Sequence, residues 1–266
     1  MVPRYRTATA FVLVSLIAAC AGPDVDRAPT RPPDVSAVPD AVPRAEPRSA
    51  SGNPPFYEVN GRRYHVMNSS RGYRKRGVAS WYGQKFHGRR TSSGEAYDMY
   101  SMTAAHKTLP LPAYARVTNL ANGQSVVVKI NDRGPFVDNR LIDLSYAAAN
   151  RLDMIRAGTA MVEVEVLDPT TPTLPARTAE ATQQTADGSM YIQAGAFRSK
   201  DNAESLARRV RAQASEDTRV FIRRDSVDGD TIYRVRIGPV AGVDQFDRLV
   251  EQMARIGISD AYLALD

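Results

Sequence analysis

The amino-acid sequence predicts two folded domains of different class, a mainly β domain followed by a smaller α+β domain. Between about residues 56 and 167, short β-type runs alternate with turns marked by glycine, asparagine and aspartate, and only residues 141–152 show a helical spacing. From residue 190 to residue 266, strand patterns alternate with two amphipathic helices. The polar segment 168–189, which has no aromatic residue, is expected to be the linker between the two domains.

The first 20 residues have the pattern of a lipoprotein signal peptide. Arg4 and Arg6 precede an apolar run that is too short to cross a bilayer, since a membrane-spanning helix needs about 20 apolar residues. Small residues then lead into Cys20, the only cysteine in the chain. An ordinary signal peptide or a buried helix would leave this partnerless thiol unexplained. The stretch resembles the lipobox of bacterial lipoproteins, and Ala21 after the cysteine favours the outer membrane.

Residues 21–55 predict a disordered, proline-rich tether. They hold more than half of the chain's 17 prolines and no aromatic residue, so they cannot build a core of their own. A flexible chain of this length spans roughly 30 Å on average, and near ~100 Å when it is extended as polyproline II. Such a tether would carry a domain from a membrane surface into the cell-wall layer.

The first domain is predicted to begin with a hairpin and to continue as a barrel. The hairpin lies within residues 56–72, where Asn60-Gly61 between two β-type runs is typical of a type I′ turn. Residues 73–167 then carry several short strands around one helix, a pattern that predicts a small closed β-barrel. The clearest of these strands are residues 78–82, 113–119, 125–130 and 160–167.

The second domain, residues 190–266, has the element order βαββαβ. A strand at 190–197 precedes a helix whose apolar residues share one face, and strands at 219–223 and 231–237 precede a second such helix. A last strand, 261–265, completes a ferredoxin-like, four-stranded sheet with both helices on one face and the other face open.

Charge and motif content exclude several functions. The formal net charge of +6 is a modest basic excess, and an exported protein meets anionic polymers of the envelope rather than nucleic acid. The three histidines, His65, His87 and His106, show no metal-binding spacing, so no metal is expected. A phosphate-binding loop and a serine nucleophile elbow are absent from the sequence too, and no cofactor is predicted.

Several motifs, in order along the chain, resemble the rare lipoprotein A family. They are GVASWYG at 77–83, FHGR at 86–89, TSSGEAYD at 91–98, TAAHKTLP at 103–110, NDRGPF at 131–136 and IDLSY at 142–146. The resemblance implies a six-stranded double-psi β-barrel with lytic transglycosylase activity. Such an enzyme cleaves peptidoglycan between N-acetylmuramic acid and N-acetylglucosamine and leaves a 1,6-anhydro end.

The second domain is similar to the SPOR domain, through YIQAGAF at 191–197 and YRVRIGP at 233–239. SPOR domains bind glycan strands stripped of their stem peptides. The resemblance therefore implies denuded glycan strands as the partner and enrichment at the division septum, with divisome proteins as further candidate partners.

Three residues are predicted to carry the chemistry, Asp132, Glu95 and His106. Cleaving a glycosidic bond needs a carboxylic acid to protonate the leaving oxygen, and a transglycosylase needs no second carboxylate because the sugar's own hydroxyl attacks. Asp132 follows an apolar strand, where its carboxylate would project from the strand end, although aspartate also caps such turns. The resemblance gives Glu95 and His106 as functional, and a neighbouring carboxylate and imidazole shift each other's pKa. The sequence leaves open whether Asp132 or Glu95 donates the proton.

Substrate contacts are expected in both domains. Trp81 and Tyr82 would stack on sugar rings or belong to the core, and Tyr97 and Asp98 follow Glu95 closely enough to line the same site. On the second domain, strand alternation places polar residues on the open sheet face. Three residues there are expected to contact glycan: Gln193 and Arg234, which match binding positions of related SPOR domains, and Ile232, where some relatives carry an aromatic residue.

Together these patterns predict a lytic transglycosylase anchored in the outer membrane, with the barrel as enzyme and the second domain as targeting module. The alternative is a non-catalytic, expansin-like peptidoglycan-binding lipoprotein of the envelope. Release of anhydromuramic ends from peptide-free glycan strands distinguishes the two.

Membrane attachment is expected to depend on Cys20. The substitution Cys20→Ser removes the thiol that the lipid would occupy, so the protein should lose labelled palmitate and move to the soluble periplasmic fraction. Metabolic labelling and membrane fractionation check this outcome. A serine variant that still incorporates palmitate would contradict the lipobox interpretation.

Overall fold

The computed structural model describes residues 28–29, 31–169, 189–215, 218–227, 229–258 and 261–265. The predicted signal peptide with Cys20, and most of the predicted linker, lie outside these residues. Among the described residues, no helix is both long and apolar enough to cross a membrane.

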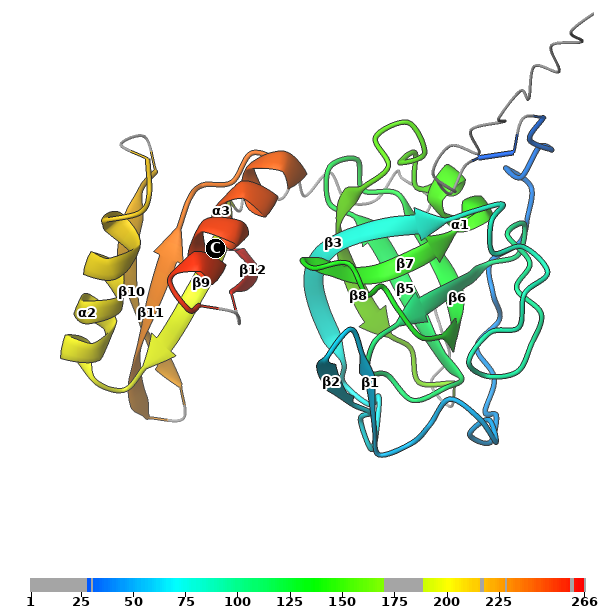
Figure 1. Ribbon diagram of the computed structural model, residues 1–266, viewed down its shortest axis with the longest axis horizontal. Coiled ribbons are helices and arrows are strands. Elements are labelled where there is room, and N and C mark those ends of the chain that lie inside the picture. Colours follow the sequence, from blue (N-terminus) through cyan, green and yellow to red (C-terminus); the bar gives the residue numbers. More distant parts are fainter. Residues whose placement is uncertain are drawn as a thin grey trace, which may run out of the picture.

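The first domain is a closed barrel of six strands, as the sequence predicts (Figure 1). Around the barrel the order is β3-β7-β4-β6-β5-β8. The pairs β3–β7 and β4–β6 are parallel and the remaining neighbours are antiparallel. The strands are β3 (Arg74–Tyr82), β4 (Thr103–His106), β5 (Ala113–Asn119), β6 (Ser125–Asp132), β7 (Arg140–Ser145) and β8 (Ala160–Val166).

Alternating apolar residues of these strands fill the barrel interior. On β6, Val126, Val128 and Ile130 are buried, and the same holds for Ile142 and Leu144 on β7. Because side chains alternate along a strand, the residues between them point to the outer face. Polar side chains such as Lys129 of β6 and Asp143 of β7 therefore lie on the outer face of the barrel.

The helical spacing predicted for residues 141–152 is only half correct. Its first part is β7, where Ile142 and Leu144 alternate into the core, and α1 covers only Tyr146–Arg151. Ser145 begins the helix, since its side chain accepts a hydrogen bond from the amide of Ala148 at 3.2 Å. A leucine three residues after another fits a strand end and a helix start equally well, so the spacing alone could not separate them.

The predicted hairpin is present as β1 (Phe56–Val59) and β2 (Arg62–His65). Asn60 and Gly61 both have positive φ, 52° and 74°, as a type I′ turn requires. The rings of Tyr57 and Tyr64 stack at 5.3 Å between centroids, and each ring also contacts Phe136 of the barrel. The hairpin is thus fixed to the barrel by aromatic contacts.

Residues 31–55 differ from the sequence prediction, because they lie against the barrel instead of forming a disordered tether. Val35 is buried in the barrel's apolar cluster, and Asp40 pairs with Arg151 at 2.9 Å. The amides of Ala41 and Ser49 donate hydrogen bonds to backbone carbonyls of barrel residues 127 and 111. The segment lacks aromatic residues, yet it needs none, since the barrel supplies the apolar surface on which it packs. We call residues 31–55 the strap.

The second domain has a four-stranded antiparallel sheet of order β10-β11-β9-β12. Apolar residues of both helices, among them Leu206, Phe246 and Met253, pack in one cluster with Ile192 and Val235 of the sheet. The elements are β9 (Met190–Phe197), α2 (Lys200–Arg211), β10 (Val220–Val227), β11 (Asp230–Ile237), α3 (Val243–Arg255) and β12 (Tyr262–Leu265).

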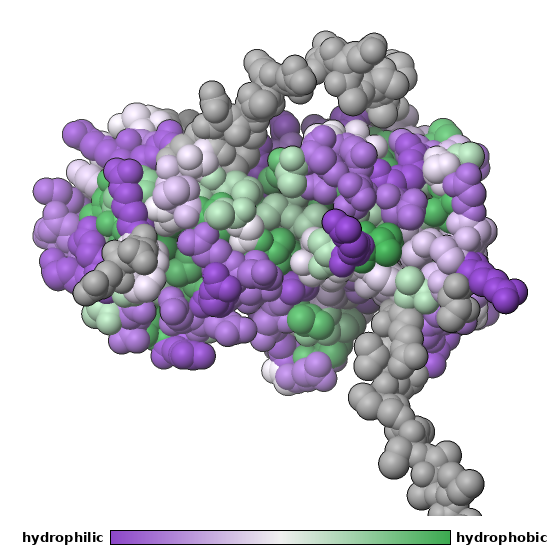
Figure 2. Space-filling view, turned by 90° about the horizontal axis from the view of Figure 1, so that it is seen from above, coloured by the Kyte–Doolittle hydropathy of each residue, from purple (hydrophilic) through white to green (hydrophobic). Residues whose placement is uncertain are grey.

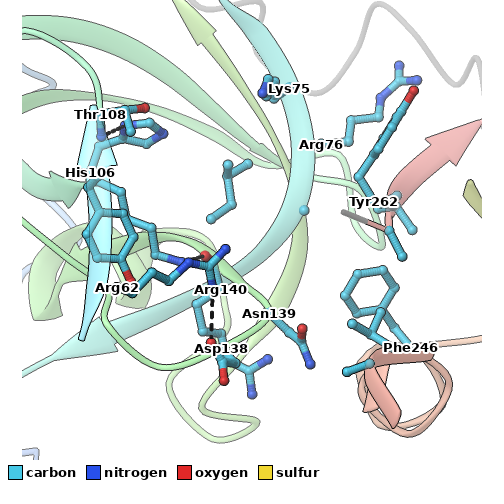
Figure 3. Close-up of a pocket in the computed structure, with 18 of the residues that line it drawn as sticks. Arg62, Lys75, Arg76, His106, Thr108, Asp138, Asn139, Arg140, Phe246 and Tyr262 are labelled. Carbon is cyan, nitrogen blue, oxygen red and sulfur yellow. Dashed lines mark hydrogen bonds and ion pairs between the residues drawn. The ribbon is translucent and has the colours of Figure 1, made fainter. Parts of the chain in front are cut away.

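The two domains touch through β3, β7 and β8 of the barrel and through α3 and β12 of the second domain. Val78 and Met161 of the barrel belong to the apolar cluster of the second domain, and Arg140 forms an ion pair with Asp247 at 2.9 Å. A cavity of about 500 Å³ lies at this contact, with Phe246 and Tyr262 on its second-domain side (Figure 3). The surface seen from above is largely hydrophilic, with apolar residues in small patches (Figure 2).

Candidate functional site

A bulge between β4 and β6 directs Asp132 to the outer face of the barrel. The register runs from Ala104 opposite Ile130 to Ala105 opposite Asp132, so Asn131 is the extra residue. Ile130 and its partner Ala104 point into the core, so Ala105, the next residue on β4, points outward. Asp132 pairs with Ala105 and therefore points outward as well. Bulges commonly re-aim a side chain in this way beside functional sites.

Three hydrogen bonds fix one oxygen of the Asp132 carboxylate. Its Oδ1 accepts from the amide of Ser92 at 2.8 Å, from the Ser92 hydroxyl at 2.7 Å and from the amide of Arg133 at 2.8 Å. The second oxygen, Oδ2, takes part in none of these bonds. The carboxylate is therefore held in one orientation through a single oxygen.

Ser92 is itself placed by a tight turn over residues 91–95. The amide and the hydroxyl of Thr91 both donate to the carbonyl of Glu95, and the amide of Ser93 donates to the carbonyl of Asn131. Gly94 has a φ of 97°, a conformation that residues with a side chain rarely adopt. This turn joins the TSSGE motif to the end of β6.

Glu95 lies in the same cluster as Asp132. Its Oε1 accepts from Lys129 Nζ at 2.8 Å, and its Oε2 accepts from Asn131 Nδ2 at 2.7 Å. Burial raises the pKa of Glu95, but the hydrogen bonds from Lys129 and Asn131 outweigh it, so the net pKa lies below its ordinary value. Glu95 is consequently an anion at neutral pH, and through Asn131 it is linked to the residue next to Asp132.

Arg133 supports the site from behind. Its guanidinium donates to the carbonyl of Gly52 at 2.9 and 2.7 Å, to that of His106 at 3.1 Å and to that of Leu109 at 2.5 Å. The residue that follows Asp132 is thus fixed to the strap, to the end of β4 and to the loop after β4.

His106 takes a different place from the one expected. Its side chain is only 3% exposed, and its Nδ1 accepts from the amides of Thr108 and Leu109 at 3.1 and 3.0 Å. The proton must then sit on Nε2, which lies 2.8 Å from the hydroxyl of Tyr73. Burial, together with nearby cations, lowers the pKa of His106 to about 3.

The structure therefore brings Asp132 and Glu95 together but does not place the imidazole beside Glu95. The His106 ring lies toward the cavity between the domains, next to Thr108 (Figure 3). Only its backbone carbonyl reaches the site, as an acceptor for Arg133.

Two of the aromatic residues predicted to contact sugars are buried. Tyr82 and Tyr97 are 6% and 2% exposed, and their rings stack on each other at 4.1 Å. Their ring faces pack on each other, so in this structure Tyr82 takes the core role that the sequence left open beside sugar stacking. Trp81 is partly buried and meets Tyr146 edge to face at 5.9 Å. Phe86, which the sequence analysis did not select, is 38% exposed and lies 6.0 Å from the ring of Tyr82.

Asp98 acts locally as a turn cap. Its two oxygens accept from the amide of Tyr100 at 3.0 Å and from the hydroxyl of Ser101 at 2.6 Å. Among the described residues, no group of three or more metal-type ligands gathers at this or any other place.

The three residues selected on the second domain share the sheet face opposite the helices. Gln193 is buried and donates to the hydroxyl of Tyr262, while its Oε1 lies 3.5 Å from Arg234 Nη1. Arg234 also donates to Asp225 at 2.7 Å, and Ile232 lies opposite Asp225 across the β10–β11 pair. A hydrogen-bonded network thus holds Gln193 and Arg234 at this face.

Sequence reasoning missed four residues of the barrel site. Ser92, Asn131 and Arg133 stand inside motifs already recognised, so their positions next to Glu95 and Asp132 were an available signal. Lys129 lies outside these motifs, and charged side chains are common on the outward face of a strand, so nothing in the sequence singled it out.

Comparison with known proteins identifies the relatives of both domains. A family model described as lytic transglycolase matches residues 74–164, and one described as SPOR domain matches residues 186–264. The endolytic peptidoglycan transglycosylase RlpA of Pseudomonas aeruginosa is 40% identical over 278 residues, covering 85% of this chain and 80% of the relative. The protein of the same name from Vibrio cholerae is 39% identical over 258 residues, covering 95% and 94%.

A solved structure is also similar. The RlpA SPOR domain from Pseudomonas aeruginosa is 27% identical to the matched part, covers 28% of this chain and 96% of that chain, and has a TM-score of 0.27.

The buried imidazole gives a testable pH dependence of stability. The folded pKa of about 3 lies below the ordinary value of about 6.5, so between these values only the unfolded chain binds a proton at His106. Acidification through this window should therefore destabilise the barrel, by up to about 1.4 kcal/mol per pH unit from this residue. His106→Gln should be less stable at pH 7 and should lose this part of the pH dependence.

Chemical denaturation of both proteins at several pH values between 4 and 7 measures the effect. His87→Gln is the matched control, since His87 is half exposed and should keep the wild-type slope. Equal slopes for wild type and His106→Gln would contradict the buried, neutral imidazole.

Proposed function

The chain belongs to the RlpA family of endolytic peptidoglycan transglycosylases, and on this premise we propose that Asp132 is the general acid–base of the reaction. The protein is an endolytic peptidoglycan transglycosylase built from a lytic transglycosylase barrel and a SPOR domain. The observation that carries the assignment of Asp132 is its outward carboxylate, whose Oδ1 is fixed by three donors.

One carboxyl group can serve both halves of the reaction. As an acid it gives its proton to the glycosidic oxygen while the bond from that oxygen to C1 of N-acetylmuramic acid breaks. As a base it then takes the proton of the C6 hydroxyl, whose oxygen bonds to C1 and closes the 1,6-anhydro ring. No water is consumed, and the acid is regenerated. With Oδ1 engaged by Ser92 and Arg133, Oδ2 of Asp132 is the atom that would exchange the proton.

Glu95 is proposed to stay ionised throughout. Its pKa is held below the ordinary value by the hydrogen bonds from Lys129 and Asn131, and each of its two oxygens accepts one of these bonds. Its role is to hold Asn131, and with it the bulge that directs Asp132 outward. His106 is assigned as a positioning residue, because its carbonyl accepts from Arg133.

The relatives' names favour the enzyme over the expansin-like alternative. Two of them are named as endolytic transglycosylases at 39–40% identity across at least 80% of their own length.

The second domain is proposed to bring the enzyme to denuded glycan strands. Gln193, Arg234 and Ile232 on the face opposite the helices are the expected contacts, and enrichment at the division septum would follow from the abundance of such strands there. Lipid attachment at Cys20 and an outer-membrane location remain proposals from the sequence.

Replacing Asp132 with asparagine should abolish most of the turnover. Asn can keep the acceptor for Ser92 and the side chain's shape, but an amide cannot exchange a proton with the glycosidic oxygen. General acid–base catalysis contributes roughly 10²–10⁴-fold, so kcat should fall by at least about 100-fold. The measurement is release of 1,6-anhydromuramic ends from denuded glycan by mass spectrometry, with a melting curve for each variant.

Glu95→Gln is the matched comparison, as it also exchanges a carboxylate for an amide within the cluster. It should lower kcat less than Asp132→Asn does. If Asp132→Asn cleaves at a near wild-type rate while Glu95→Gln is inactive, Glu95 is the acid. If neither variant loses activity, the assignment of both residues fails.

Septal enrichment should depend on Arg234. In a full-length fluorescent fusion, Arg234→Gln removes a cation of the open sheet face and should turn a septal signal into a uniform peripheral one. Arg248→Gln makes the same change on the exposed face of α3 and should leave the septal signal intact. Septal enrichment that survives Arg234→Gln would argue against this face as the binding surface.

A further inference from the structure

The strap contacts the cluster around Asp132 at three consecutive points. Glu46 lies beside Lys129, Ser51 contacts Ser92, and Gly52 contacts Arg133. The sequence assigns this segment only a tethering role, so the contacts call for an explanation.

The first contact divides one cation between two carboxylates. Lys129 Nζ lies 3.1 Å from Glu46 Oε2 of the strap and 2.8 Å from Glu95 Oε1. The hydroxyl of Tyr114 donates to the other oxygen of Glu46, which fixes that carboxylate from its second side. Arg44 adds a positive charge near Glu46. Lys129 is thus held by Glu95 of the barrel and by Glu46 of the strap. Its fixed ammonium group in turn orients the carboxylate of Glu95.

The other two contacts act on the neighbours of Asp132. The Ser51 hydroxyl donates to the carbonyl of Ser92 at 2.9 Å, and the Gly52 carbonyl accepts two hydrogen bonds from Arg133. Ser92 and Arg133 are the residues that donate to Asp132 Oδ1. Gly52 has a φ of 79°, and a Cβ added there would lie 2.6 Å from the carbonyl oxygen of Ser92. The backbones of strap and site are therefore packed too closely to admit a side chain at residue 52.

We propose that residues 46–52 of the strap are positioning residues of the transglycosylase site, with Glu46 orienting Glu95 through Lys129 and Gly52 holding Arg133. The inference rests on the proposed function, and it assigns part of the active-site framework to the segment that leads toward the N-terminus.

The proposal has an electrostatic consequence that mere packing would not have. The groups that face Glu95 are Lys129, Asn131 and, across Lys129, Glu46. The negative charge of Glu46 raises the pKa of Glu95 and so offsets part of the lowering by Lys129 and Asn131. The neutral variant Glu46→Gln removes that charge, so Glu95 keeps its ion pair with Lys129 without the competing carboxylate of Glu46.

The test compares Glu46→Gln with Asp40→Asn in the full-length protein. Both substitutions replace a strap carboxylate that pairs with a barrel cation, but the partner of Asp40 is Arg151, which has no contact with Glu95 or Asp132 in the hydrogen bonds described above. Glu46→Gln should lower kcat on denuded glycan by about 10-fold or more with little change in KM, because small displacements of catalytic groups are costly. Asp40→Asn should keep the wild-type kcat.

A second measurement is independent of activity. In protein labelled at glutamate carboxyl carbons, the NMR titration midpoint of Glu95 should fall in Glu46→Gln and stay unchanged in Asp40→Asn. An unchanged kcat and midpoint in Glu46→Gln overturns the proposal, and so does an equal loss of kcat in both variants, which would mean that the strap acts through docking alone. If the wild-type protein releases no anhydro ends, the proposed function fails, and the Glu95 midpoint alone then decides for or against the positioning role.

Discussion

The Arg133 guanidinium joins parts of the chain that the fold would otherwise leave independent. It donates to carbonyls of Gly52 in the strap, of His106 at the end of β4 and of Leu109 in the loop after β4. A half-buried guanidinium is tolerated when its donors are satisfied, and here the acceptors are backbone oxygens that no side-chain substitution can remove. Because Arg133 directly follows Asp132, the position of the proposed acid depends on all three acceptors. The buried His106 ring stabilises the same loop, because its Nδ1 accepts hydrogen bonds from the amides of Thr108 and Leu109.

Much of the fold could be predicted from alternation, and the errors have physical causes. The strands of the barrel and the elements of the second domain follow from apolar spacing, which reports burial directly. The strap could not be predicted in this way, because Val35 and Val38 are scattered apolar residues among prolines without a strand or helix period, and their partner surface lies far away in the sequence. Composition indicates whether a segment can build an apolar core of its own. It does not indicate whether the segment can pack on the core of another part of the chain.

The proximity of Asp132 and Glu95 was predictable from the sequence, but the arrangement of the groups around them was not. Asp132 and Glu95 stand in motifs, and the structure places them in one cluster. His106 stands in a motif as well, but strand alternation at β4 sends its side chain away from Glu95. Tyr82 and Tyr97 show the same ambiguity, since an aromatic residue in a motif serves a core as readily as a ligand. Lys129 and Glu46 belong to an ion cluster whose members are 83 residues apart in the sequence, and no local pattern links them.

The bulge at Asn131 makes the length of β6 matter more than its composition. A strand has a side-chain period of two, so in a regular strand Asp132, two residues after the inward Ile130, would point toward the apolar interior, and the bulge is what turns its carboxylate to the outer face. A substitution at residue 131 changes one hydrogen bond, whereas a deletion of residue 131 removes the bulge itself and an insertion there shifts Asp132 against β4. Genetic variation in this segment should accordingly be tolerated as exchange of side chains and eliminated as insertion or deletion. The single extra residue of the bulge thus keeps the carboxylate of Asp132 on the outer face of the barrel.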